Sequence, residues 1–205
     1  MFQPVILLTT TVHVIPSQQS GQYDPSVRKL VYLSTIRRWL SETKFDIVVV
    51  ENSGYKFEEI PKNDRLEIVS FCRFDMPPHI QFFLDNNPDK GNHEMYAIDQ
   101  AINRSKKLRE CEFFIKVTGR YFVPELKNLP SDIDFVAQSD STRCEILGCR
   151  RSLATNLFYF PSYDAHVEET YAARLLRSKD KKIFRLPLMS IPPTQMGSGA
   201  IVNTL

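Results

Sequence analysis

The chain has 205 residues, of which 42% are hydrophobic and 24% charged, the composition of a soluble globular protein with one sizeable core. A formal net charge of +2 is too small to indicate a nucleic-acid or anionic-membrane partner. No segment reaches the roughly 18 apolar residues of a membrane helix, and the amino terminus lacks signal-peptide character. Cys72, Cys111, Cys144 and Cys149 show neither C-x-x-C nor zinc spacing, which favours reduced thiols. We therefore expect a single cytoplasmic domain over residues 1–205.

The chain begins with a predicted strand and a helix. Residues 5–14 form a β-rich run that is apolar first and rich in threonine later, and a loop is expected over residues 16–23. Asp24 and Pro25 supply an N-cap and a proline at the first helical position of a helix that should run to about residue 42. The apolar stripe of this helix is predicted to be Val27, Leu30, Leu33, Ile36 and Leu40.

Two further strands and a second helix are predicted next. Residues 45–50 form a β-branched run that ends at a turn, and residues 66–71 form a third strand. The proline-containing segment 72–89 is predicted to be irregular. Asn92 is expected to cap a helix with the apolar stripe Met95, Ile98, Ala101, Ile102 and Leu108. Alternation of strands and helices is typical of a parallel sheet.

The segment from residue 113 to residue 123 is an apolar run with a polar interruption. It is predicted to be a buried strand, with Gly119 permitting a close backbone approach or a sharp bend at its end. Ligands of open α/β sheets bind at the carboxyl ends of strands, so Lys116, Thr118 and Arg120 are expected to face a ligand. Two cationic side chains and a hydroxyl indicate that this ligand is an anion. The alternative is that the two cations are the solvated end of an edge strand.

The remaining residues show weaker periodicity. Residues 135–138 are predicted to form a short strand, and residues 184–191 are an apolar segment interrupted by proline. No regular element is predicted over residues 145–160. Asp164 is expected to cap a helix with the inward stripe Val167, Tyr171 and Leu175. Residues 196–205 are a candidate mobile tail.

Several common enzyme motifs are missing. The sequence contains no G-x-G-x-x-G after its first strand, no G-x-x-x-x-G-K-[ST], no G-x-S-x-G and no H-E-x-x-H. The sequence therefore lacks the motifs that usually identify four classes of enzyme: dinucleotide oxidoreductases, P-loop NTPases, serine hydrolases and zincins. The polar segments that remain fall at strand ends or at a helix start, which would place them along one rim of the sheet: residues 9–13, 51–54, 90–94 and 116–120.

Several motifs carry a resemblance to a known family. The threonine-rich end of the first strand, Val48-Val-Val-Glu-Asn-Ser-Gly54, Lys90-Gly-Asn-His-Glu94, Lys116-Val-Thr-Gly-Arg-Tyr121 and Val167-Glu168 resemble the small GT-A-fold nucleotide-sugar glycosyltransferases of viral, algal and bacterial surface-polysaccharide systems. The resemblance covers about residues 5 to 195. It implies a single α/β domain with a mostly parallel sheet flanked by helices. Residues 1–123 would bind the nucleotide and residues 124–195 the acceptor.

The resemblance implies transfer of a sugar from a nucleotide-diphosphate donor to a hydroxyl of a glycan or glycoprotein, as in polysaccharide biosynthesis or protein glycosylation. Glu51 and Asn52 would contact the base or ribose, and Lys90 and Gly91 would lie near the diphosphate. The residues expected to bind the nucleotide sugar are Thr9, Thr10, Thr11, His13, Glu51, Asn52, Ser53, Lys90, Gly91, Glu94, Lys116, Thr118, Gly119 and Arg120. The candidates for the general base are Glu168 and Glu169. Inversion and retention are not distinguished.

The sequence departs from this family at the metal motif. Most such enzymes carry Asp-x-Asp where this chain has the segment 116–120, and the two carboxylates hold a divalent cation against the leaving diphosphate. Arginine and lysine can stabilise the same charge directly, so neither manganese nor magnesium is expected as a cofactor. Asp85, Asp89 and Asp140 are the alternative metal ligands.

Structural explanations and other functions stay open. His13 also suits a hydrogen-bonded loop position, and Glu94 and Glu168 suit the acidic first turn of a helix. Arg143, Arg150 and Arg151 are further candidates for binding an acceptor or a phosphate. One alternative function is a non-catalytic nucleotide-sugar or glycan binding module. Another is a sugar-1-phosphate nucleotidyltransferase, which is disfavoured because residues 9–22 contain one glycine and no Gly-rich loop.

Overall fold

The computed structural model describes residues 3–14, 24–87, 89–140, 143–160, 166–195 and 201–205. Its centre is a seven-stranded sheet of order β3-β2-β1-β4-β6-β5-β7, in which only β6 runs antiparallel to its neighbours. The strands of this sheet are β1 (Val5–Thr10), β2 (Ile47–Glu51), β3 (Leu66–Ser70), β4 (Phe113–Thr118), β5 (Phe135–Gln138), β6 (Ile146–Arg150) and β7 (Ile183–Leu186). The prediction of a single α/β domain with a mostly parallel sheet is confirmed.

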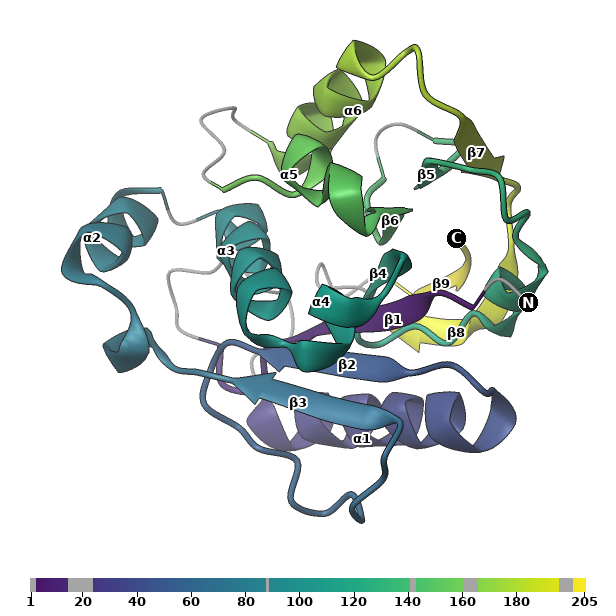
Figure 1. The fold of residues 1–205 in the computed structure, drawn as a ribbon. Coiled ribbons are helices and arrows are strands. Elements are labelled where there is room, and N and C mark those ends of the chain that lie inside the picture. Colours follow the sequence, from purple (N-terminus) through teal and green to yellow (C-terminus); the bar gives the residue numbers. More distant parts are fainter. Residues whose placement is uncertain (1–2, 15–23, 88, 141–142, 161–165, 196–200) are drawn as a thin grey trace.

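Helices cover both faces of the sheet (Figure 1). One face packs against α1 (Pro25–Glu42), and the other against α2 (Pro78–Asn86), α3 (Lys90–Arg104), α4 (Lys106–Glu110), α5 (Ala154–Leu157) and α6 (Val167–Arg177). Alternate residues of the buried strands serve the two cores: Ile6 and Leu8 pack on the α1 side, and Val5 and Leu7 on the α3 side. Burial on both faces explains why these strands are continuous apolar runs.

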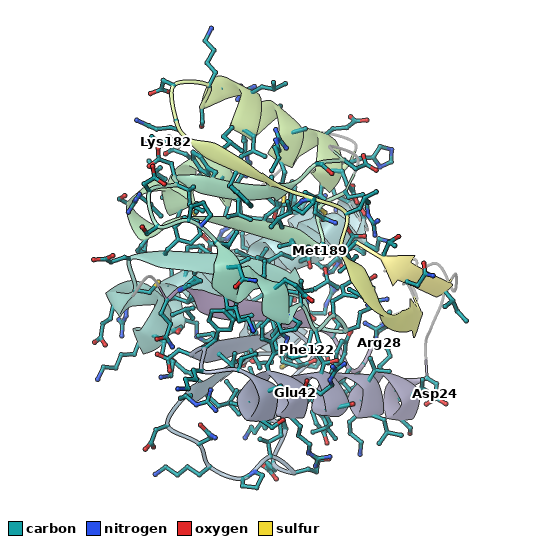
Figure 2. The ribbon with its side chains drawn as sticks, turned by 90° about the vertical axis from the view of Figure 1, so that its right-hand side faces the viewer. Asp24, Arg28, Glu42, Phe122, Lys182 and Met189 are labelled. Carbon is teal, nitrogen blue, oxygen red and sulfur yellow. The ribbon has the colours of Figure 1, made fainter. Side chains whose placement is uncertain are left out.

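Helix α1 has the predicted start and end but a different buried face. Asp24 caps it by accepting hydrogen bonds from the first-turn N–H groups. Val27 and Leu30, predicted to be buried, are 39% and 64% exposed. The residues that the helix buries are Arg28, Tyr32, Leu33, Thr35, Ile36 and Trp39. The buried face differs from the predicted one because Arg28 and Thr35 donate hydrogen bonds to backbone carbonyls inside the domain. Figure 2 shows Arg28 on the inner side of α1.

Helix α2, strand β6 and the short helix α5 were not predicted, and one cap is corrected. Helix α2 lies in the segment predicted to be irregular, because Pro78 occupies its first turn, where a missing N–H costs little. Strand β6 lies in a region of poor periodicity, and its pairing comes from β4 and β5, which are distant in sequence. Asn92 does not cap α3. Asp89 is the N-cap, and its Oδ1 accepts a hydrogen bond of 3.1 Å from the N–H of Gly91.

The carboxyl-terminal residues also differ from the prediction. Strands β8 (Ser190–Gln195) and β9 (Ile201–Thr204) form an antiparallel pair. Met189 and Leu205 exchange two backbone hydrogen bonds of 2.8 and 2.9 Å, and Leu205 is buried. The predicted tail is therefore attached to the domain at residues 201–205. Its remainder, like the predicted loop 16–23 and the predicted cap Asp164, lies outside the described residues.

Two expectations from composition can be compared with the structure. Within the described residues, no helix has the length and apolar character needed to cross a membrane. All four cysteines are free thiols, and Cys144 and Cys149 are buried. Burial raises the pKa of Cys111 to about 11, so this thiol is protonated at neutral pH.

Gly119 follows β4 at a close approach to β1, the first of the two predicted roles. Its N–H donates to the carbonyl of Thr9 at 2.9 Å, and an added Cβ would lie 2.7 Å from that same oxygen. The backbone of β1 cannot move aside without disturbing its pairing. We expect Gly119→Ala to lower the unfolding free energy by about 1–3 kcal/mol in urea denaturation. An unchanged midpoint would contradict this close approach.

Candidate active site

A cavity of about 650 Å³ opens at the carboxyl ends of β1, β2 and β4. The strand order reverses between β1 and β4, and open α/β sheets bind ligands at such a switch point. The volume falls within the roughly 300–1,000 Å³ of small-molecule sites. Helix α1 and the amino ends of α3 and α6 complete the wall. The described residues that line it are Thr9, Thr10, Thr11, Val14, Arg28, Tyr32, Asn52, Asp89, Lys90, Gly91, His93, Glu94, Ala97, Thr118, Arg120, Tyr121, Arg143, Cys144, Glu145, His166, Val167 and Glu168.

The structure brings most of the predicted site residues together. Those that line the cavity are Thr9, Thr10, Thr11, Asn52, Lys90, Gly91, Glu94, Thr118, Arg120 and Glu168. Those that do not are His13, Glu51, Ser53, Lys116, Gly119 and Glu169. The first group comes from five separate segments of the chain. Three of them meet because β1, β2 and β4 are parallel and end at the same edge of the sheet, and the other two are the first turns of α3 and α6.

Glu51 organises the backbone instead of facing the cavity. Its side chain is fully buried, and Oε1 accepts a hydrogen bond of 2.8 Å from the N–H of Val12. Oε2 accepts from the N–H groups of Ser53 and Tyr55 at 2.9 and 2.7 Å. The predicted contact of Glu51 with a base or ribose is therefore corrected, because both carboxylate oxygens are engaged within the protein. Its neighbour Asn52 does reach the cavity.

Lys116 is buried beneath the cavity. Its side chain is 0% exposed, and its Nζ lies 2.9 Å from Oε1 of Glu94 and donates to the carbonyl of Cys144 at 2.8 Å. Burial acts to lower the pKa of Lys116, but the Glu94 carboxylate and other nearby groups outweigh burial, and the net pKa is raised. Lys116 is thus a charged ammonium that is paired internally. This corrects the prediction that it presents its charge to a ligand.

Glu94 is held from two directions at the cavity wall. The same oxygen that meets Lys116 accepts a hydrogen bond of 2.5 Å from Oγ1 of Thr9. The Glu94 side chain is 21% exposed, and the residue lines the cavity. The first turn of α3 and the end of β1 therefore fix this carboxylate in one orientation.

Positive side chains reach the cavity from three other elements. Arg28 comes from α1, Lys90 from the start of α3, and Arg120 from the segment after β4. Arg28 donates to the carbonyl of Thr11 at 2.6 Å and to the Tyr32 hydroxyl at 2.7 Å. Burial lowers the pKa of Arg28, Tyr32 partly offsets this, and Arg120 lowers the pKa further. The two guanidinium groups therefore lie within electrostatic range of each other, an arrangement that an anion would stabilise.

The two candidate bases have different surroundings. Glu168 lies in the first turn of α6 and lines the cavity, where the Cys144 thiol donates a weak contact of 3.8 Å to its Oε1. Glu169 is exposed and does not line the cavity. The structure therefore corrects the prediction for Glu169 and leaves Glu168 as the candidate.

Several cavity residues were not predicted. Arg28 was not among the predicted site residues, although its i,i+4 spacing to Tyr32 was a usable signal. Cys144 and Glu145 precede β6, an antiparallel strand whose amino end reaches the cavity. His93 is buried in the first turn of α3. Burial, followed by the charge of Arg73, lowers the pKa of this histidine, which favours a neutral imidazole at pH 7.

The proposed metal ligands do not converge. Asp85 is exposed and forms an ion pair with Arg73, and Asp140 is exposed. Asp89 lines the cavity but caps α3. Within the part of the chain that the structure describes, no group of three or more His, Cys, Asp or Glu side chains could hold a metal ion. The donor set present here does not fit the Asp-x-Asp arrangement.

The fold of this chain is similar to that of a solved nucleotide-diphospho-sugar transferase-like structure. A similar solved structure is a candidate nucleotide-diphospho-sugar transferase from Desulfovibrio desulfuricans G20, with a TM-score of 0.53 and 11% identity over 91% of this chain and 80% of that chain. Another is a cytidylyltransferase from Leptospira borgpetersenii, with a TM-score of 0.49 and 15% identity over 91% of this chain and 76% of that chain. No protein-family profile and no curated protein sequence matches this chain. At 11% identity, the first likeness establishes the fold.

Proposed function

We propose that this protein transfers a sugar from a nucleotide-diphosphate donor to a hydroxyl of a glycan or glycoprotein acceptor. The observation that carries the proposal is the cavity itself, which combines the cations Arg28, Lys90 and Arg120 with the carboxylate of Glu168 at the β1–β4 switch point. Cations suit a diphosphate, and a carboxylate suits the activation of a hydroxyl. The GT-A-like fold supports the same class of reaction.

The donor would lie across the strand ends. Asn52 and Thr11, whose side chains are joined by a hydrogen bond of 2.6 Å, are on the β2 side, where we place the base and ribose. Arg28, Lys90 and Arg120 would bind the diphosphate. The acceptor would enter near α6.

The chemistry requires one base and stabilisation of one leaving group. The acceptor oxygen forms a bond to the anomeric carbon as the bond from that carbon to the diphosphate oxygen breaks. Glu168 would take the proton of the acceptor hydroxyl, and the cations would stabilise the charge that develops on the departing nucleoside diphosphate.

A thermal-shift panel tests the proposal directly. Nucleoside diphosphates and nucleotide sugars should raise the melting temperature, because a ligand of the native state stabilises it. A nucleotide sugar that binds should then be a donor, giving sugar transfer to an acceptor or slow hydrolysis when no acceptor is present. Binding with no turnover on any acceptor would favour a binding module. Release of pyrophosphate from a nucleoside triphosphate and a sugar 1-phosphate would favour a nucleotidyltransferase. No shift with any nucleotide at millimolar concentration would exclude the proposal.

Arg120 should contribute strongly to diphosphate binding. Arg120→Ala removes a charge-assisted contact to phosphate, and we expect the dissociation constant to rise about 10- to 150-fold, equivalent to about 1.5–3 kcal/mol. Titration calorimetry with a nucleoside diphosphate measures this change. Arg109→Ala, at an exposed position in α4, is the matched control and should bind as the wild type does. Equal affinities for both variants would place the diphosphate elsewhere.

Activity should not require a divalent cation. At the end of β4 the chain carries Lys116 and Arg120 instead of paired carboxylates, and a metal beside Arg120 would meet like charge. We expect turnover to survive an excess of EDTA. If EDTA abolished turnover and manganese restored it, metal ligation would have to be sought at Asp89, the proposed ligand that lines the cavity.

A further inference from the structure

We infer that Glu94 selects the donor by accepting a hydrogen bond from a hydroxyl group of the donor's sugar ring, with Lys116 and Thr9 as positioning residues. The inference rests on the proposed function and deepens it, because it assigns a sugar-reading role to one carboxylate of the cavity wall.

One oxygen of Glu94 is occupied and the other is available. Oε1 lies 2.9 Å from Nζ of Lys116 and accepts from Oγ1 of Thr9 at 2.5 Å. Among the residues that the structure describes, no donor is bonded to Oε2, although the side chain lines the cavity and is 21% exposed. The carboxylate is therefore fixed through Oε1, which leaves Oε2 as the oxygen that can accept from a ligand.

The charge of Glu94 defines the kind of group that can bind it. An ionised carboxylate only accepts hydrogen bonds, so its partner must be a donor. Phosphate oxygens of a diphosphate have no proton to give at neutral pH and would be repelled, whereas sugar hydroxyls donate readily. The buried ammonium of Lys116 offsets the negative charge, which reduces repulsion toward a neighbouring diphosphate.

The position of Glu94 favours the sugar ring over the ribose. Cys144, which precedes β6, links the two carboxylates. Its thiol lies 3.8 Å from Oε1 of Glu168, and its carbonyl accepts from Lys116, whose Nζ lies 2.9 Å from Oε1 of Glu94. Asn52, where we place the base, lies instead at the end of β2 on the other side of β1. The transferred sugar must lie between the diphosphate and the acceptor base, which is the side that Glu94 occupies.

A chemical double-mutant cycle tests the inference. The probe is whichever of UDP-glucose, UDP-galactose and GDP-mannose gives the largest thermal shift, together with its nucleoside diphosphate and its monodeoxy-sugar analogues. For the wild type, one deoxy position should weaken binding about 10-fold or more. Glu94→Gln should bind the parent nucleotide sugar about 10-fold more weakly than the wild type does. Its affinity for that deoxy analogue should be no lower than its affinity for the parent nucleotide sugar. Its affinity for the nucleoside diphosphate should stay within about 2-fold of the wild type.

The controls separate this inference from the proposed function. Glu110→Gln, at an exposed helix position, should bind every ligand as the wild type does. Thr9→Val keeps the carboxylate but removes one of its donors, and it should reduce the preference for the parent sugar over the deoxy analogue by about 3-fold. This variant replaces Glu94→Gln in the test if Glu94→Gln does not fold. An unchanged Glu94→Gln, or an equal loss for the diphosphate and the nucleotide sugar, overturns the inference and leaves the proposed function standing. If no nucleotide binds the wild type, the proposed function and the inference both fall.

Discussion

Lys116→Met should lower the free energy of unfolding by about 3–5 kcal/mol, the typical cost of removing one partner from a buried ion pair. Lys116 is fully buried, and its ammonium is the cation that faces Oε1 of Glu94. Methionine has a similar length but leaves that carboxylate and the carbonyl of Cys144 without their donor. Urea denaturation followed by circular dichroism measures the change.

Two further variants test whether the loss of stability comes from the buried ion pair. Lys116→Met combined with Glu94→Gln should recover part of the loss, because the remaining partner is no longer charged. Lys106→Met, which removes an exposed lysine of α4, should change stability by less than about 0.5 kcal/mol. The folded-state pKa of Lys116 lies above the ordinary 10.5, so the stability that it supplies is fully present below that pH and is lost as pH rises through the folded-state pKa. The difference in unfolding free energy between the wild type and Lys116→Met should therefore be constant from pH 7 to pH 9. If Lys116→Met were as stable as the wild type, the pairing of Lys116 with Glu94 would be contradicted.

Glu168→Gln should lower kcat by about 10²- to 10⁴-fold, the usual contribution of a general base. The amide is nearly isosteric with the carboxylate but cannot take the acceptor's proton. Donor binding should change little, because we place the diphosphate on the cations and not on α6. Initial rates at saturating donor, with transfer or donor hydrolysis as the readout, separate kcat from KM.

Glu169→Gln is the matched control for that experiment. The substitution is the same, the position is adjacent, and the side chain is exposed outside the cavity. Its kcat should equal that of the wild type. If Glu169→Gln were inactive and Glu168→Gln active, the assignment of the base would be reversed.

The rim of the sheet was predictable from sequence because its cause is local. Buried parallel strands have a recognisable composition, and polar residues directly after them must fall at one edge of the sheet. Thr9, Asn52 and Thr118 therefore reach the cavity as expected. Their contacts with a nucleotide sugar remain predictions.

The errors arose where a polar side chain has a partner that is distant in sequence. Lys116 at the end of a strand was expected to face a ligand, but Glu94 from a different element neutralises it within the domain. Arg28 was absent from the predicted site, but its donation to the carbonyl of Thr11, 17 residues away, holds it at the cavity wall. Hydrophobic periodicity reports where apolar groups lie and carries no information on such partners.

The antiparallel direction of β6 accounts for another group of omissions. A search for site residues after strands finds β1, β2 and β4, whose carboxyl ends meet the cavity. Cys144 and Glu145 stand before a strand, and they reach the same place only because β6 runs against its neighbours. The direction of a five-residue strand depends on pairing between distant segments, which the local pattern does not contain.

The cavity wall and the layer beneath it hold two kinds of charge that respond differently to dissolved salt. Lys90 is exposed, and ions of the medium screen charges of this kind over about 8–10 Å at ordinary ionic strength. The ammonium of Lys116 is out of reach of water and ions, with Glu94 as its counter-ion. The electrostatic field beneath the strand ends is therefore fixed by the fold itself and stays the same in dilute buffer and in a salt-rich compartment.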